Sequence, residues 1–175
     1  TNHLKRMSKQ CIFIALSNQK GGVGKSTMTV LLASYFHYVR GKTVAVMDCD
    51  YPQFSIQTLR DRDVSNVEKS EQLQRKLCEQ YERVGKKAYP IVTAGADKVL
   101  EAAGSLSETC DLIFFDLPGT VNSPGVLEAI MNMDYVFTPV IQDRMQSVIR
   151  FHHPGFHPPT SSGATERNPL VLEQD

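Results

Sequence analysis

The feature that most constrains this chain is a glycine-rich segment between a short apolar run and an amphipathic stretch. Residues 11–16 (CIFIAL) form a continuous apolar run of the length expected for a strand buried on both faces. Residues 25–40 carry apolar side chains at helical spacing, and Gly41 suits the position that ends a helix. The segment between them holds three glycines, which allow backbone conformations closed to other residues. The sequence therefore predicts a strand, a tight loop and a helix.

Apolar runs and amphipathic stretches continue to alternate along the chain. Further strands are predicted at residues 43–47, 89–93, 112–115 and 135–141. Further helices are predicted at residues 65–84, 96–107 and 126–133. The helix over 65–84 begins at an S-x-x-E capping motif, ends at Gly85, and carries mixed charges that predict a solvated polar face. Because such strands lie parallel, we expect an α/β fold: a three-layer parallel sheet with helices on both faces.

Composition narrows the class of protein. The length of 175 residues fits one domain with a hydrophobic core, and the net charge of zero gives no sign of a nucleic-acid binder. No apolar run approaches the roughly 20 residues that span a bilayer, and residues 11–16 are too few for a signal-peptide core. The four cysteines form no CxxC pair, which disfavours a zinc or iron–sulfur site. We expect a cytoplasmic protein without membrane association.

Polar clusters follow three of the predicted strands. The glycine-rich loop comes after Leu16, Asp48 and Asp50 follow the strand at 43–47, and Asp116 follows the strand at 112–115. Ligands of parallel α/β sheets bind beyond the carboxyl ends of the strands. The sequence therefore predicts one site at this edge, built from all three clusters.

The glycine-rich loop has the chemistry of a phosphate site. Gly24-Lys25-Ser26 matches the end of the pattern G-x-x-x-x-G-K-[ST], although Asn18 or Gln19 stands where the pattern has its first glycine. Glycines let several N–H groups point at one anion, and the start of a helix adds its positive dipole end. A lysine can then contact the phosphates and a hydroxyl can bind Mg²⁺. The alternative is a glycine turn without a ligand, which the flanking strand and helix disfavour.

Three segments together resemble a known family. They are KGGVGKST (20–27), DCDYPQFS (48–55, with a tyrosine inserted before Pro52) and IFFDLPGT (113–120). These segments resemble the ParA/MinD-type P-loop ATPases with a deviant Walker A motif, over residues 11–141. The apolar flank with its loop, FIALSNQKGGVGKS (13–26), and the DCDYPQFS segment are most similar to the ParA-like (TraA-type) proteins of conjugative transposons.

The resemblance implies ATP and Mg²⁺ as cofactors. The implied nucleotide-binding residues are Gly21, Gly22, Val23, Gly24, Lys25, Ser26, Thr27 and Gly119. The implied metal-site residues are Ser26, Asp48 and Asp116, the last resembling the Walker B aspartate. Lys20 matches the signature lysine, which in this family reaches the partner's phosphates across an ATP-sandwiched homodimer. Asp50 matches the aspartate that orients the attacking water.

Plainer alternatives exist for these residues. Lys20 would otherwise be a solvated loop lysine, but the complete KGGVGK spacing favours the functional interpretation. Asp48 and Asp50 would otherwise cap a turn. Their i, i+2 spacing at a strand end points both carboxylates to the same side, which favours a shared site.

The chain departs from the family near its end. Residues 151–175 hold four of the nine prolines and three of the five histidines and show no regular period. We therefore expect an ATPase domain over 1–150 and an irregular tail over 151–175, as in a truncated or frame-shifted family member. His152, His153 and His157 could ligate a metal, but composition explains them better.

Two functions follow from these expectations. The first is an ATPase switch: an ATP-dependent homodimer that engages DNA, a DNA-bound adaptor or a conjugation protein, in DNA segregation or conjugative transfer. The second is a shortened nucleotide-binding interaction module with little or no turnover. The motif residues favour the first function and the shortened C-terminal part favours the second.

Overall fold

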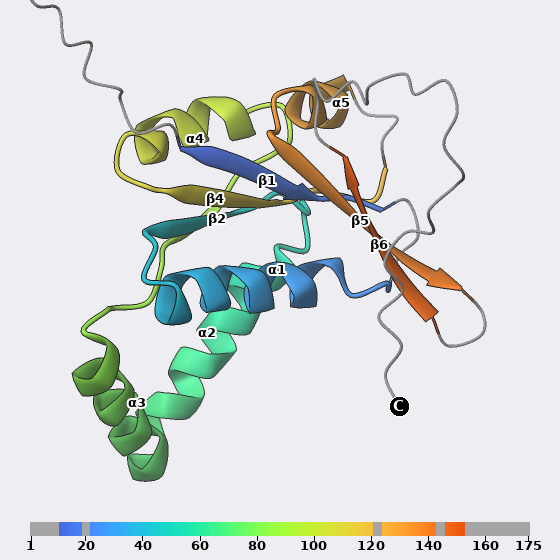
Figure 1. Cartoon of the computed structure of the whole chain (residues 1–175). Coiled ribbons are helices and arrows are strands. Elements are labelled where there is room, and N and C mark those ends of the chain that lie inside the picture. Colours follow the sequence, from blue (N-terminus) through green and yellow to red (C-terminus); the bar gives the residue numbers. More distant parts are fainter. Residues whose placement is uncertain (1–10, 19–21, 121–123, 143–145, 153–175) are drawn as a thin grey trace, which may run out of the picture.

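In a computed structural model, the described part of the chain comprises residues 11–18, 22–120, 124–142 and 146–152. Its six strands form one sheet in the order β3-β2-β4-β1-β5-β6 (Figure 1). The strands are β1 (Ile12–Leu16), β2 (Val44–Asp48), β3 (Ile91–Thr93), β4 (Leu112–Asp116), β5 (Tyr135–Gln142) and β6 (Gln146–His152). Strands β1 to β5 pair in parallel, and β6 pairs antiparallel to β5.

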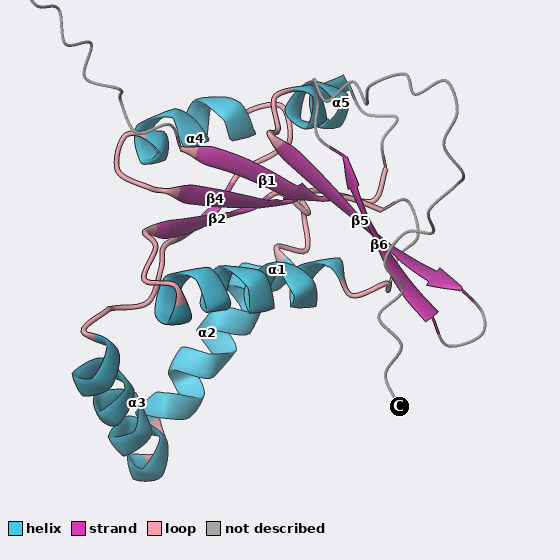
Figure 2. Ribbon diagram, in the orientation of Figure 1, coloured by secondary structure: helices cyan, strands magenta, loops and turns pink. Residues whose placement is uncertain are grey.

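Helices cover both faces of the sheet (Figure 2). They are α1 (Lys25–Ser34), the π-helical η1 (Tyr35–Val39), α2 (Ser55–Glu68), α3 (Glu71–Val84), α4 (Val99–Ser107) and α5 (Pro124–Met131). Helices α1 and α2 lie on one face, and α4 and α5 lie on the other (Figure 1). The predicted fold class, a parallel sheet between two layers of helices, is confirmed.

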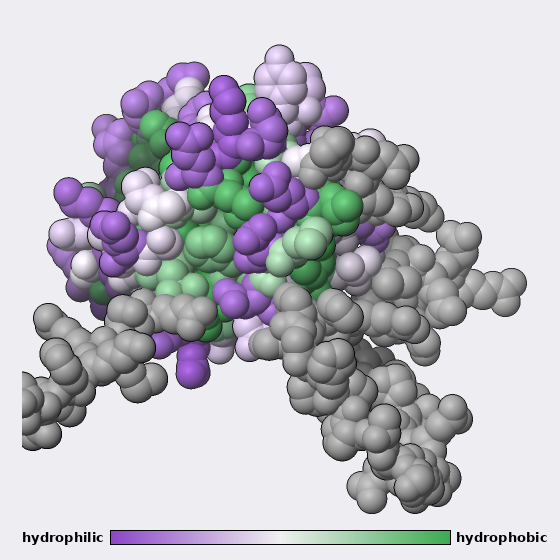
Figure 3. Space-filling model, turned by 90° about the horizontal axis from the view of Figure 1, so that it is seen from above, coloured by the Kyte–Doolittle hydropathy of each residue, from purple (hydrophilic) through white to green (hydrophobic). Residues whose placement is uncertain are grey.

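Each face of the sheet has its own core. Phe114 packs with Ile56 of α2 and Ala33 of α1, whereas the next residue, Phe115, packs with Val99 of α4. Strands β2 and β4 are buried along their whole length, as their continuous apolar sequences predict. A fully buried phenylalanine contributes roughly 1.5–3 kcal/mol to the stability of the fold. On the α4–α5 side, apolar side chains gather at the centre of the surface (Figure 3).

The helix predicted over 25–40 changes geometry before it ends. Its last turn is the π-helical segment η1, in which Arg40 N–H donates to Tyr35 O at 3.0 Å, five residues back. Gly41 has a φ of +69°, the left-handed conformation that favours glycine after a helix. The predicted stop at Gly41 is therefore confirmed.

The helix start predicted at Ser65 is wrong. Ser65 lies near the end of α2, a helix that the sequence did not predict. The true cap of the next helix is Ser70, whose Oγ accepts a hydrogen bond from Leu73 N–H at 3.4 Å. The end of this helix at Gly85, with a φ of +67°, is as predicted.

Strand β6 is a second element that the sequence did not predict. Its antiparallel pairing with β5 runs from Val136–His152 to Gln142–Gln146. The strand includes His152 and so extends two residues past the predicted boundary at 150. The rest of the predicted tail, 153–175, lies outside the described residues and includes His153 and His157.

Within the described ranges, no helix is long and apolar enough to cross a membrane.

The approach of α5 to the loop before α4 yields a stability prediction. A Cβ at Gly125 would lie 2.8 Å from Asp97 N and 2.9 Å from Asp97 Cα, both backbone atoms that cannot move aside cheaply. We expect Gly125→Ala to lower the free energy of unfolding by roughly 1–3 kcal/mol. At Gly104, inside α4, nothing lies within 4 Å of the same position. Gly104→Ala should therefore raise stability by up to about 1 kcal/mol. Urea denaturation of both variants measures the contrast, and equal effects would contradict it.

Candidate functional site

The sheet brings the predicted polar clusters to one edge. In the pairing register, Leu16 of β1 lies opposite Asp116 of β4, and Asp116 lies opposite Asp48 of β2. The ends of three adjacent strands therefore stand level. Gly119 follows three residues after Asp116, on the loop that leaves β4. The predicted convergence of these segments is present in the fold.

The loop between β1 and α1 uses its glycines for left-handed backbone conformations. Gly22 has a φ of +74° and Gly24 a φ of +81°, where a side chain would be strained. Gly24 is the N-cap of α1 and offers no side chain to the first N–H groups of the helix. Those N–H groups and the positive end of the helix dipole remain available to an anion. Gln19, Lys20 and Gly21 lie outside the described residues.

The entrance of this loop is anchored to β5. Ser17 N–H donates to Phe137 O at 3.0 Å, and the Asn18 side-chain amide donates to Pro139 O. Asn18 lies one residue before position 19, where the phosphate-loop pattern, counted back from Gly24, has its first glycine. Its side chain thus fixes where the loop leaves the sheet, a role that the motif did not reveal.

Asp116 is the most unusual carboxylate of the site. It is 1% exposed, and neither of its oxygens has a hydrogen-bond partner within the described part of the chain. Burial, with a smaller contribution from the nearby carboxylates of Asp48 and Asp50, raises the pKa of Asp116 to about 6. The Ser26 hydroxyl and the Lys25 ammonium act in the opposite direction and lower this pKa. Two residues from the start of α1 therefore lie near enough to Asp116 to offset part of the cost of burying its carboxylate.

Asp48 has one oxygen committed to the fold. Its Oδ2 accepts hydrogen bonds from Ile56 N–H and Gln57 N–H, both at 2.9 Å, in the first turn of α2. Its Oδ1 is buried and has no hydrogen-bond partner among the described residues. Burial raises the pKa of Asp48, while the backbone N–H groups of Gln57 and Ile56 lower it. Asp48 thus caps a helix with one oxygen and keeps the other for the site.

The turn after Asp48 holds the remaining acidic residue. The Asp50 carbonyl accepts hydrogen bonds from Gln53 N–H at 2.8 Å and Phe54 N–H at 2.9 Å, which closes the turn. Cys49, between the two aspartates, is buried, and burial raises the pKa of its thiol. The inserted Tyr51 is 72% exposed at the rim. The turn therefore holds Asp50 beside the strand ends.

The donor set suits a hard cation such as Mg²⁺. Carboxylate and hydroxyl oxygens are its usual ligands, and both oxygens of Asp116 and Oδ1 of Asp48 are buried without partners. No group of three or more His, Cys, Asp or Glu side chains in the described ranges is placed to hold a metal. Mg²⁺ in nucleotide sites needs no such group, because it keeps several waters and binds one or two protein oxygens and the phosphates.

The fold and the loop define a P-loop nucleotide-binding protein. The family model "ATPase MipZ" matches residues 12–148. The chain therefore belongs to the MipZ ATPase family, within the ParA/MinD-like P-loop superfamily. No protein with curated annotation matches it significantly.

Solved structures of other P-loop proteins match at low identity. The signal recognition particle receptor FtsY of Elizabethkingia anophelis in complex with GDP has 19% identity and a TM-score of 0.38, over 77% of this chain. FlhF complexed with GMPPNP and Mg²⁺ has 15% identity and a TM-score of 0.43, over 74% of this chain. This chain spans 37% of that FtsY chain and 46% of that FlhF chain. The family assignment rests on the family model.

The pKa of Asp116 predicts how stability depends on pH. Because this pKa is about 6 in the folded chain and about 3.9 in unfolded chains, the folded state holds the proton more tightly. Stability should therefore fall as the pH rises from about 4 to about 6, by roughly 3 kcal/mol from this group. In Asp116→Asn this contribution is absent. The free energy of unfolding of the variant should therefore rise relative to that of the parent protein over the same pH range. Chemical denaturation at several pH values measures both chains, with the exposed Asp61→Asn as control. Parallel curves for parent and Asp116→Asn would contradict the prediction.

Proposed function

We propose that this chain is a Mg²⁺-dependent ATP-binding and ATP-hydrolysing switch of the ParA type. Membership of the MipZ ATPase family supports nucleotide binding. The observation that carries the proposal is the unpartnered carboxylate of Asp116, which faces Ser26 and Lys25 at the start of α1. A buried anion in this position favours a bound cation, and the open start of α1 favours a phosphate.

In this proposal the loop and α1 bind the phosphates. Backbone N–H groups from Gly21 to Thr27 surround the β- and γ-phosphates, and Lys25 places an ammonium against them. Mg²⁺, when bound, neutralises charge that develops on the transferred phosphoryl group. Ser26 would bind it directly, and Asp116 and Asp48 Oδ1 would hold its water ligands. Gly119 would donate its N–H to the γ-phosphate, which would distinguish ATP from ADP.

Hydrolysis would need two further residues. Asp50 would orient the attacking water, and its contribution would be mainly positioning because phosphoryl transfer is largely dissociative. Lys20 would act across an ATP-sandwiched homodimer and stabilise charge at the partner's phosphates, as an arginine finger does. This arrangement gives the two lysines of the loop separate tasks: Lys25 serves its own nucleotide and Lys20 that of the partner.

The process served by the switch is part of the proposal. The DCDYPQFS segment resembles the TraA-type proteins of conjugative transposons, which supports DNA segregation or conjugative transfer. The partner would then be DNA, a DNA-bound adaptor or a conjugation protein. A second candidate is a nucleotide-binding interaction module with little turnover. ATP turnover by the purified chain, with and without DNA, separates the two.

Lys25 provides the test of nucleotide binding. Lys25→Ala removes the cation at the start of α1, so we expect ATP affinity in the presence of Mg²⁺ to fall by at least about tenfold. Isothermal titration measures it. Lys69→Ala, which removes an exposed lysine at the end of α2, should leave affinity unchanged. Equal affinity of the Lys25→Ala variant and the parent would mean that this loop does not bind phosphates.

Lys20 and Asp50 provide the test of the sandwich dimer. Lys20→Ala and Asp50→Ala should each be inactive alone, whereas a mixture should regain part of the hydrolysis rate. In a mixed dimer, the Lys20→Ala subunit keeps its own Asp50 and receives Lys20 from its partner, so one site is complete. If Lys20 acted within its own subunit, every site in the mixture would lack one residue. A flat rate in a mixture that demonstrably contains mixed dimers would exclude the role across the dimer.

A further inference from the structure

Helix α3 carries an apolar face that the described part of the chain does not cover. Leu73, Leu77 and Tyr81 are 38%, 51% and 50% exposed, and no residue of α3 is buried. The helix lies away from the sheet, beyond the end of α2 (Figure 1). At 3.6 residues per turn these three side chains and Val84 lie within about 80° of one another. They form a single stripe, and we call it the α3 stripe.

The stripe leads into a hollow beside η1. This hollow has a volume of about 560 Å³ and lies between the C-terminal ends of η1 and α3. Val39 of η1, itself 70% exposed, and Val84 of α3 line it together. Lys86 fixes this arrangement, because its Nζ donates to Gly41 O at 2.8 Å and to Lys42 O at 2.7 Å. The apolar surface is therefore continuous from α3 to η1. The hydrogen bonds of Lys86 hold the two sides of the hollow together.

The border of this surface is basic. Arg83 and Lys86 line the hollow, and none of the described residues that line it is acidic. Lys76 lies on the same side of α3 as Arg83, since seven residues make about two turns of a helix. Arg40 and Lys42 flank Gly41, which also lines the hollow, and both are exposed. The chain as a whole has no net charge, so this concentration of positive charge is local.

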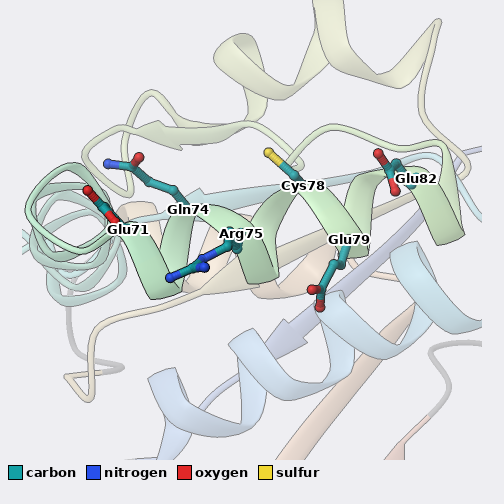
Figure 4. Close-up of a pocket in the computed structure, with 6 residues that line it drawn as sticks. All are labelled: Glu71, Gln74, Arg75, Cys78, Glu79 and Glu82. Atoms are coloured by element: carbon teal, nitrogen blue, oxygen red, sulfur yellow. The ribbon is translucent and has the colours of Figure 1, made fainter.

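The opposite face of α3 has the reverse character. Its residues Glu71, Gln74, Arg75, Cys78, Glu79 and Glu82 line a second, shallow hollow (Figure 4). All six belong to this one helix, and three of them are glutamates. The helix therefore has a polar, mainly acidic face and an apolar face with a basic border. A partner that prefers the apolar face must carry the complementary charge.

We propose that the α3 stripe and the hollow beside η1 dock an amphipathic helix of a partner protein whose apolar ridge is flanked by acidic residues. The ridge covers Leu73, Leu77 and Tyr81, and an apolar side chain at its end enters the hollow between Val39 and Val84. The acidic flank lies against Lys76, Arg83 and Lys86. This is helix-in-groove recognition, in which apolar anchors supply affinity and the charged border selects the partner.

Charge and apolarity together favour this occupant. A nucleic acid would use the cations but would leave the apolar stripe uncovered. A second copy that paired through the same face with antiparallel α3 helices would place Lys76 and Arg83 against their own counterparts. The surface also lies at the amino ends of β2 and β3, opposite the phosphate loop, so it is independent of the proposed ATPase site.

The test uses the whole chain, without nucleotide, and three labelled 18-residue synthetic peptides. One is a helical peptide with leucines on one face and glutamates beside them, the second has lysines in place of the glutamates, and the third is a scrambled form of the first. Fluorescence anisotropy should show that the glutamate peptide binds at least about tenfold more tightly than either of the others. Equal binding of the glutamate and lysine peptides, or of the scrambled form, would overturn the proposal.

Matched variants locate the binding. Leu77→Glu and Arg83→Glu should each weaken binding of the glutamate peptide about tenfold. Arg75→Glu, with the same charge change on the other face of α3, should leave it unchanged. So should Leu127→Glu, which alters a leucine of similar exposure on α5. Circular dichroism shows whether each variant folds, and Leu77→Glu and Arg83→Glu test the apolar and the charged part of the surface separately. Equal losses in Arg83→Glu and Arg75→Glu would overturn the proposal.

Two other outcomes would also overturn it. If duplex DNA binds the parent chain and Arg83→Glu abolishes this while Leu77→Glu does not, the surface is a nucleic-acid site. If sedimentation shows a nucleotide-free dimer that Leu77→Glu dissociates, the stripe is an interface between copies of this chain.

Discussion

The site depends on the unfavourable burial of two neighbouring carboxylates at the carboxyl edge of the sheet. The parallel register places Asp116 level with Asp48, and both are buried. Removing two neighbouring carboxylates from water is unfavourable, and this is why the pKa values of both are raised. Asp48 is partly compensated by the N–H groups of α2, and Asp116 by the Ser26 hydroxyl and the Lys25 ammonium. Asp116 still has a raised pKa and would be stabilised by more positive charge, and Lys25 at the start of α1 already acts in that direction.

The same edge determines how the rest of the chain is arranged. Asp48 Oδ2 accepts hydrogen bonds from the first turn of α2, so one oxygen of the site sets where this helix begins. Helix α2 then slants away from the sheet and ends where α3 begins (Figure 1). The apolar face of α3 and the carboxylates of the site are therefore connected by a single helix.

Local sequence patterns predicted much of this arrangement. The buried strands are short apolar runs, and Gly24-Lys25-Ser26 signals a tight turn into a helix, so neighbouring residues carry the information. Helix α2 has no such signal, because Ile56 is its one buried residue and its cap is Asp48, which precedes it by several residues in the chain. The stretch 65–68 imitates a capping motif, although the cap that forms is Ser70. Strand β6 depends on pairing with β5, and its own sequence, QSVIRFH, alternates apolar and polar residues only over its last four positions.

Periodicity also has a limit that α3 makes plain. The spacing of Leu73, Leu77 and Tyr81 predicts which side chains share a face, but it carries no information on what covers that face. In α1 the apolar residues of the same kind of pattern differ in burial: Ala33 is buried against the sheet, whereas Leu31 is 64% exposed. A short helix gains most of its stability from packing its apolar side. An α3 stripe left in water gives up that contribution, and burying three large apolar side chains against a partner would recover several kcal/mol. The free energy available from burying the α3 stripe is a physical reason for this surface to bind a partner. The buried carboxylate of Asp116, at the other edge of the sheet, is in the same way a reason to bind a cation.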